Sequence, residues 1–314
     1  MPVFDIIGDV HGQHRMLVAL LDQLGYEEKG GAYAHDEADR TAIFVGDLID
    51  RGEHQRETVD LVRAMAETGS ARVVMGNHEF NALSWATHSD ASDDGWARPH
   101  AEDKRRQHAA YLEAVGEGSD RHQEDLAWFR TLPLWLDEPG VPRVVHACWH
   151  EPAMEVIAQA LGGRPMDDDF IRQANNPDTD LHQAVEDVLK GPEVPLGGET
   201  FTLEGISRSE VRITWWDLAD PVLHKVAVVP WGVDVGTLPA TDLSDRVAPY
   251  RYPSDAPPVY FGHYWCRGEP TYLAPNAVCL DYSAAKGHSL VACTVDPAKP
   301  GLGEFTVEIG PEGP

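Results

Sequence analysis

The sequence contains little lysine and little cysteine, and it has no long run of apolar residues. Lysine occurs only at positions 29, 104, 190, 225, 286 and 299, and the formal net charge of the 314 residues is −27 at pH 7. Proteins that bind nucleic acids or anionic membranes do so through clustered Lys and Arg. The composition therefore argues against both kinds of partner.

Cysteine is limited to four scattered positions without a CxxC pair, which indicates neither a zinc ribbon nor a disulfide framework. We expect reduced, buried thiols at Cys148, Cys266, Cys279 and Cys293. Apolar runs stay short of the ~18 residues that a membrane-spanning helix needs, and Met1–Asp5 offers no signal segment. These absences predict a soluble, cytoplasmic protein.

The sequence does contain a repeated unit, in which a short apolar run precedes a polar residue, often with glycine between them. The five runs, each with the polar residue that follows it, are 3–7 with Asp9, 41–45 with Asp47, 72–75 with Asn77, 143–145 with His146 and 259–261 with His263. Helix-compatible stretches follow the first three runs, at 13–24, 53–68 and from about 78. This alternation predicts an α/β fold with polar residues at the carboxyl ends of its strands.

The remaining segments predict elaborations of the same domain. Residues 89–125 are polar and suit a helical insertion, and residues 191–248, rich in Gly and Pro, predict loops and strands, with 225–229 among the strands. Antiparallel strands are predicted towards the C-terminus, at 277–281, 289–295 and 304–309. Because no linker divides the chain, we expect a single domain over residues 1–314.

The polar residues behind the apolar runs suit metal ligation. A single Asp after glycine is usually a turn residue, but here the pattern recurs and supplies only oxygen and imidazole donors. The candidate ligands are Asp9, His11, Asp47, Asn77, His146 and His263. Asp9 and His11 lie two residues apart, so on an extended segment they face one side and could hold one ion. A second ion would take Asn77, His146 and His263, and the two oxygens of Asp47 would bridge the pair at ~3.5–4 Å.

Three blocks carry a resemblance to a known family: Gly8-Asp9-Val10-His11-Gly12, Gly46-Asp47-Leu48-Ile49-Asp50-Arg51-Gly52 and Gly76-Asn77-His78-Glu79. They resemble the signature blocks of the phosphoprotein phosphatase family within the calcineurin-like metallophosphoesterases, and the chain is most similar to bacterial members. The resemblance spans residues 9–263. It implies an α/β fold in which a central two-sheet β-sandwich is flanked by helices.

The resemblance also implies roles for individual residues. The six candidate ligands would bind the metals, His78 would donate a proton to the leaving oxygen with Asp50 as its partner, and Arg51 would hold the phosphoryl group. Family members usually carry a second phosphate-binding arginine ahead of a Trp and Asp-Pro segment. Arg208 and Arg212 both precede such a segment at 215–221, with Arg212 slightly preferred; a surface arginine is an equally good interpretation.

The function predicted on these grounds is a dinuclear metal-dependent phosphatase that hydrolyses phosphomonoesters, as protein Ser/Thr phosphatases do, by attack of a metal-bridging hydroxide. The alternative is a bis(5'-nucleosyl)-tetraphosphatase, and a third hypothesis is a metal-binding module without turnover. Two divalent ions are expected, with Mn²⁺ preferred over Fe, Zn, Co, Ni or Mg. The partner would be a phosphorylated protein, a small phosphate ester or a nucleotide. Other histidines lie in polar stretches and are expected to be exposed, among them His100, His108 and His122.

Overall fold

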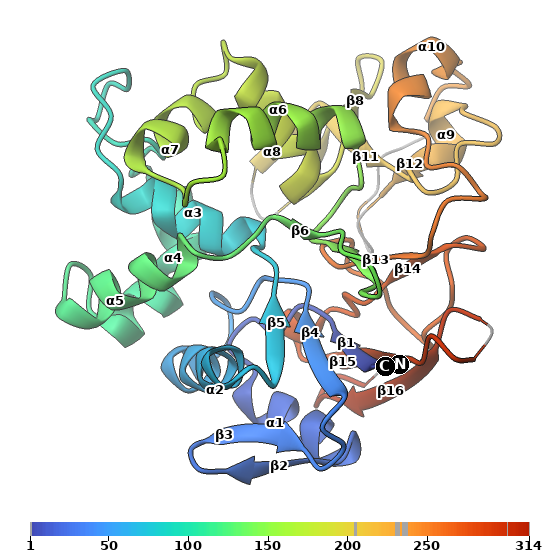
Figure 1. Ribbon diagram of the computed structural model, residues 1–314. Helices are drawn as coiled ribbons and strands as arrows, with labels where there is room; N and C mark the ends of the chain where they lie inside the picture. Colours follow the sequence, from blue (N-terminus) through green and yellow to red (C-terminus); the bar gives the residue numbers. More distant parts are fainter. Residues whose placement is uncertain (1, 204–205, 230–232, 234–237, 300, 314) are drawn as a thin grey trace.

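Figure 1 shows a computed structural model of the chain, which describes residues 2–203, 206–229, 233, 238–299 and 301–313. Two sheets lie at its centre. In spatial order, the first contains β16 (Glu304–Ile309), β15 (Ser289–Val295), β1 (Val3–Ile7), β4 (Arg40–Phe44) and β5 (Ala71–Val73). The second contains β14 (Ala277–Cys279), β13 (Val259–Phe261), β7 (Arg143–Val145) and β6 (Trp135–Leu136). This arrangement confirms the predicted α/β fold.

Apolar side chains from both sheets meet in one cluster. Ile6 and Ile43 of the first sheet lie in it with Val144, Tyr260 and Val278 of the second, and each is at most 1% exposed. Complete burial of an aliphatic or aromatic side chain stabilises the folded chain by about 1.5–3 kcal/mol. The cluster therefore holds the two sheets face to face as a sandwich.

The parallel strands of the first sheet bring their carboxyl ends to one edge. β1 pairs with β4 and β4 with β5, both in parallel. The connections run through α1 (His14–Gln23) and α2 (Gln55–Thr68), and α1 buries Leu17 and Leu21, one helical turn apart. Between α1 and β4 lies a hairpin of β2 (Tyr26–Lys29) and β3 (Ala32–His35). Residues that follow β1, β4 and β5 therefore come together.

The prediction of antiparallel strands near the C-terminus is correct for two strands and wrong for one. β15 pairs antiparallel with both β1 and β16. β14, however, runs parallel to β13, with Cys279 opposite Phe261. A parallel neighbour needs a long crossover connection, and residues 262–276 provide it. The apolar character of 277–281 shows a buried strand but does not show its direction.

Six longer helices follow β5, and in Figure 1 most of them lie above the five-stranded sheet. They are α3 (Asn77–Ala86), α4 (Glu102–Val115), α5 (Asp120–Phe129), α6 (Glu151–Leu161), α7 (Asp168–Ala174) and α8 (Asp180–Lys190). The predicted insertion at 89–125 corresponds to a loop, α4 and the first part of α5.

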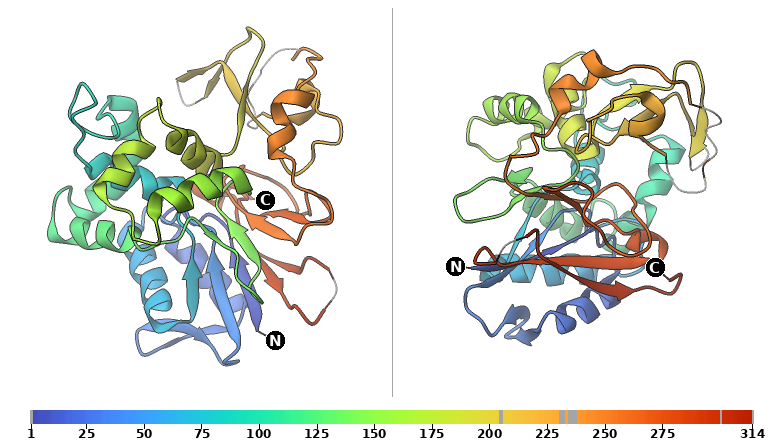
Figure 2. Two further views of the ribbon diagram at one scale, coloured as in Figure 1. Left: turned by 45° about the horizontal axis from the view of Figure 1, so that its top comes forward. Right: turned by 90° about the vertical axis from the view of Figure 1, so that its right-hand side faces the viewer.

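Short elements fill the region predicted at 191–248, of which residues 204–205, 230–232 and 234–237 lie outside the described part. They are β8 (Glu193–Pro195), β9 (Phe201–Leu203), β10 (Ile206–Arg208), β11 (Glu210–Ile213), α9 (Leu223–Val226), β12 (Ala227–Val228) and α10 (Ser244–Val247). β9 and β10 form a hairpin that stands away from the sandwich in both views of Figure 2. The strand predicted at 225–229 is partly wrong, because Leu223 and Val226 point into the core from a helical turn.

All four cysteines are free thiols, as expected, although Cys266 is half-buried while the other three are buried. Within the described residues, no helix combines the length and the apolar character needed to cross a membrane.

Candidate active site

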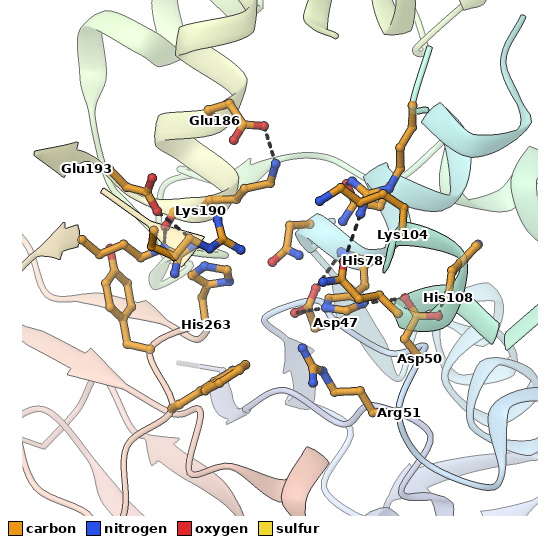
Figure 3. Close-up of a pocket in the computed structure, with 18 of the residues that line it drawn as sticks. Asp47, Asp50, Arg51, His78, Lys104, His108, Glu186, Lys190, Glu193 and His263 are labelled. Carbon is orange, nitrogen blue, oxygen red and sulfur yellow. Dashed lines mark hydrogen bonds and ion pairs between the residues drawn. The ribbon is translucent and has the colours of Figure 1, made fainter. Parts of the chain in front are cut away.

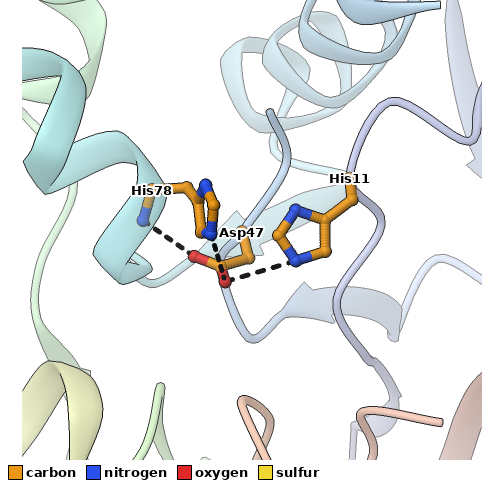
Figure 4. Close-up of side chains that lie close together, drawn as sticks. All are labelled: His11, Asp47 and His78. Atoms are coloured by element: carbon orange, nitrogen blue, oxygen red, sulfur yellow. Dashed lines mark hydrogen bonds and ion pairs between the residues drawn. The ribbon is translucent and has the colours of Figure 1, made fainter. Parts of the chain in front are cut away.

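Asp47 lies at the centre of the site, directly after β4 and Gly46. Its buried carboxylate faces two different histidines: Oδ2 is 3.4 Å from Nε2 of His11, and Oδ1 is 3.4 Å from Nε2 of His146. Figure 4 shows the His11 side of this arrangement. Each separation has room for an ion at ~2.0–2.2 Å from both ligand atoms. The carboxylate of Asp47 could therefore bridge two cations.

Backbone carbonyls fix the orientation of both histidines. Nδ1 of His11 lies 2.8 Å from the Ile49 carbonyl oxygen, and Nδ1 of His146 lies 2.8 Å from that of Val45. A carbonyl only accepts, so each Nδ1 carries a proton, and in the neutral ring Nε2 is the atom left to bind a metal. Burial lowers the pKa of His11 to about 3, against the attraction of Asp47. His11 is thus a neutral imidazole, the form that binds metals.

Asp9 and His263 each carry a buried atom without a hydrogen-bond partner among the described residues, Oδ1 and Nε2 respectively. The other oxygen of Asp9 accepts from the backbone N–H of His263 at 3.1 Å. Burial, followed by the charges of Asp281 and Asp47, raises the pKa of Asp9 well above its ordinary value. Buried polar atoms are normally paired, and a divalent cation would pair these two and offset the gathered negative charge. The residues present therefore fit a metal site.

The predicted ligands lie together in space. Two sets of ligand atoms are within 4.8 Å of one another: those of His11, Asp47 and His78, and those of Asp47, His146 and His263. Oδ1 of Asn77 lies 3.0 Å from Nε2 of His146. Asp9 adjoins His263 through the hydrogen bond described above. The structure thus brings together all six residues predicted as ligands, while their binding of metal stays a prediction.

Backbone strain and close approach are concentrated at these positions. His11, Asp47 and His263 have φ angles of 46°, 51° and 72°, a region that residues other than glycine rarely adopt and that is commonly kept at functional sites. A Cβ on Gly262 would lie 1.9 Å from Oδ1 of Asp9, and one on Gly76 would lie 2.2 Å from Oδ1 of Asp47. Only glycine lets these strand ends approach the carboxylates so closely.

His78 and Asp50 form the pair that the sequence predicts. Nδ1 of His78 lies 2.5 Å from Oδ2 of Asp50, and its Nε2 lies on the side of Asp47, 3.9 Å from Oδ2. Burial alone would lower the pKa of His78, but the carboxylates of Asp47 and Asp50 raise it above its ordinary value. The two carboxylates therefore favour the protonated form of His78, which a proton donor requires.

His108 also binds Asp50, and the sequence-based prediction missed it. Its Nδ1 donates to Oδ1 of Asp50 at 2.8 Å, so the carboxylate lies between two imidazoles. Although burial opposes ionisation, His108 and then His78 hold the pKa of Asp50 well below its ordinary value. The expectation that His108 and His122 are exposed is wrong, since they are 3% and 2% exposed. The spacing of residues in the sequence indicated this burial, because His108 lies on one face of α4 with the buried Tyr111 and Val115.

A second missed residue is Glu79, which is fully buried. Its carboxylate accepts hydrogen bonds from the backbone N–H groups of Asp47 at 2.9 Å, Leu48 at 2.8 Å and Gly76 at 2.9 Å. It therefore ties the loop after β4 to the start of α3. The first turn of α3 carries Asn77, His78 and Glu79 in succession, so one helix sets the positions of all three.

A cavity of about 230 Å³ lies over Asp47 (Figure 3). All three arginines predicted to bind phosphate line it: Arg51, Arg208 and Arg212. The guanidinium of Arg51 lies 5.1 Å from the ring centroid of Trp265, a cation–π contact. After burial, the charge of Arg212 contributes most to lowering the pKa of His263. Arg212 thus lies close to the predicted metal ligands, although its binding of phosphate stays a prediction.

Comparison with known proteins places these residues in a wider context. The sequence model of the calcineurin-like phosphoesterases matches residues 2–182. The asymmetrical bis(5'-nucleosyl)-tetraphosphatase PrpE of Halalkalibacterium halodurans is 52% identical over 75 residues, which are 24% of this chain and 30% of that protein. The chain thus aligns with only about a third of the length of this relative.

Longer matches have lower identity. The symmetrical bis(5'-nucleosyl)-tetraphosphatase of Methylococcus capsulatus is 27% identical over 297 residues, covering 92% of this chain and 90% of that protein. Among solved structures, a protein serine/threonine phosphatase from Saccharomyces cerevisiae is similar with 15% identity and a TM-score of 0.48, over 98% of this chain and 79% of that one.

Proposed function

Because the chain belongs to the calcineurin-like phosphoesterase family, we propose that it hydrolyses phosphate esters with the help of two divalent cations. The observation that carries the proposal is the bridging position of Asp47, whose two oxygens face His11 on one side and His146 on the other. The unpaired buried atoms of Asp9 and His263 support it, since they face no other partner among the described residues.

The two ions would be held by two groups of side chains that share Asp47. Asp9 and His11 would complete one group, and Asn77, His146 and His263 would complete the other. Oxygen and imidazole donors suit Mn²⁺, which we prefer, as well as Fe, Zn, Co, Ni or Mg. When bound, the ions supply Lewis-acid polarisation of the phosphate and a nucleophile at neutral pH.

The side chains around the cavity perform the remaining tasks. Arg51 and Arg212 would bind the equatorial phosphoryl oxygens, because a planar guanidinium offers two parallel N–H groups to an anion. His78 would protonate the leaving oxygen, and Asp50 would keep its ring oriented for that transfer. Such acid catalysis contributes typically ~10²–10⁴-fold, most for leaving groups that are poor on their own.

Two substrate classes fit this chemistry. Phosphomonoesters, including phosphoproteins, are the first, because His78, Asp50 and Arg51 need only one phosphoryl group. Dinucleoside polyphosphates are the second, and they are favoured by the names of the relatives from Halalkalibacterium halodurans and Methylococcus capsulatus. Initial rates on a phosphopeptide, an aryl phosphate and diadenosine tetraphosphate, measured with added Mn²⁺, separate the two classes.

The decisive test of the function itself is the isosteric change Asp47→Asn. We expect it to reduce metal content and to lower turnover of every substrate by more than ~10²-fold, since even partners of metal ligands contribute 10–100-fold. Asp36→Asn, at an exposed carboxylate of the β2–β3 hairpin region, is the matched control and should behave as wild type. Full activity and full metal content in Asp47→Asn would contradict the proposal.

A further inference from the structure

The cavity over Asp47 collects positive charge in a strongly acidic chain. Its cationic side chains are Arg51, Arg98, Lys104, Lys190, Arg208 and Arg212. Lysine is rare in this sequence, and the net charge is −27, so this concentration is not a property of the surface in general. The proposed binding of a single phosphoryl group uses only Arg51 and Arg212. It gives no role to the other cations of the cavity.

On the side of His263, carboxylates pair with two of the cations. Lys190 forms an ion pair with Glu186, and Arg212 lies 3.6 Å from Glu193. Figure 3 shows Glu186, Lys190 and Glu193 on the same side of the cavity as His263, with His78, Asp50 and Lys104 across from them. Lys190 and Arg212 therefore have less charge to offer an additional anion than an unpaired cation would have.

On the opposite side, Arg98 is held by neutral groups. Its guanidinium donates to Oδ1 of Asn81 at 2.5 Å and to Oε1 of Gln107 at 3.4 Å. Of the described carboxylates, none forms an ion pair with it. Burial lowers the pKa of Arg98 from its ordinary value, and the charges of Asp50, Glu186 and Asp103 oppose this only in part. Lys104 lines the same cavity and forms an ion pair with the half-exposed Asp103, at 3.2 Å.

The position of Arg98 is fixed relative to the proton donor. Its backbone N–H donates to the carbonyl of Ser84 at 3.1 Å, and its side chain binds Asn81, so α3 holds it at two points. His78 lies in the first turn of the same helix. Asn81 follows His78 by three residues, which is ~4.5 Å along the helix axis. Arg98 is therefore held by the helix that also carries the proposed proton donor.

We propose that Arg98, together with Lys104 of the same insertion, forms a second anion site that binds a phosphate group adjacent to the one being cleaved. The inference rests on the proposed function and specifies its substrate class, an ester of two or more linked phosphates rather than a monoester. The fork of the guanidinium binds two oxygens of that phosphate. The amides of Asn81 and Gln107 orient the fork without neutralising its charge.

The test compares wild type, Arg98→Gln and Arg98→Lys in the presence of excess Mn²⁺. Calorimetric titration gives the dissociation constants of orthophosphate and of methylenediphosphonate, a stable mimic of two linked phosphates. Steady-state kinetics give kcat/KM for phenyl phosphate and for diadenosine tetraphosphate. We expect Arg98→Gln to weaken methylenediphosphonate binding and tetraphosphate hydrolysis by about 10–100-fold, as the loss of charge-assisted hydrogen bonds implies. Orthophosphate binding and phenyl phosphate hydrolysis should change little, and Arg98→Lys should lie between.

Arg105→Gln provides the matched control, because Arg105 lies on α4 and pairs with Glu117 away from the cavity. Equal losses for the mono- and diphosphate ligands in Arg98→Gln, no loss at all, or the same loss in Arg105→Gln would overturn the second anion site. A preference of wild type for an acidic phosphopeptide over methylenediphosphonate would also overturn it. If wild type binds methylenediphosphonate through Arg98 but hydrolyses no phosphate ester, the proposed function fails and the anion site stands.

Discussion

The contact between His108 and Asp50 allows the proposed proton donor to be tested without touching it. Asp50 is held by two imidazoles, His78 at 2.5 Å and His108 at 2.8 Å. Replacing His108 by Ala removes one charge-assisted hydrogen bond, which contributes about 1.5–3 kcal/mol. If that bond keeps Asp50 in position to orient His78, kcat should fall by about 10–100-fold on a substrate whose leaving group needs protonation.

The assay is steady-state hydrolysis of two aryl phosphates, phenyl phosphate and nitrophenyl phosphate, which differ in how readily the leaving oxygen departs without a proton. We expect His108→Ala to slow phenyl phosphate hydrolysis strongly and nitrophenyl phosphate hydrolysis weakly. His108→Asn should restore much of the rate, because its amide nitrogen can occupy the position of Nδ1. His122→Ala, at an equally buried histidine of α5, controls for the cavity left by the ring. A loss of the same size on both substrates would refute the reasoning.

Two further predictions concern Gly262 and Trp265. Gly262→Ala places a Cβ 1.9 Å from Oδ1 of Asp9, so it should lower the metal content and the melting temperature. The control Gly268→Ala, which has open space around its Cβ, should keep its metal. Unchanged metal content in Gly262→Ala would exclude Asp9 as a ligand in this geometry. Trp265→Leu removes the cation–π contact with Arg51, worth about 0.5–2 kcal/mol, and should raise KM more than it lowers kcat. Trp265→Phe keeps an aromatic ring and should retain part of the contact. A change confined to kcat would show that Trp265 does not position Arg51 for substrate binding.

The parts of the site that the sequence predicts are those encoded by local pattern. A strand followed by glycine and an acidic or amide residue can be recognised in the sequence. Because parallel strands end at one edge of a sheet, the pattern predicts that Asp9, Asp47 and Asn77 lie near one another. The direction of β14 is different, because it depends on the path of the chain between 262 and 276 rather than on the strand. The single-domain organisation over residues 1–314 stays a prediction.

His108 shows a second limit of local pattern. Its neighbours on α4 are largely polar, which favours an exposed helix, and only the spacing of His108, Tyr111, Leu112 and Val115 indicates a buried face. That face packs over Asp50, a residue 58 positions away. No short motif joins two such segments, so the contact becomes evident only in the folded chain.

The short helix α3 restricts how this protein can change over time. It carries a predicted metal ligand, the proposed proton donor, the carboxylate that ties down the loop after β4, and the amide that binds Arg98, all within five residues from Asn77 to Asn81. A substitution that shifts this helix would disturb every one of these tasks together, so selection has little freedom there. New preferences for substrates are therefore expected to arise by replacement in the loop and helices that follow α3, where a side chain such as Lys104 can vary while the reaction itself is preserved.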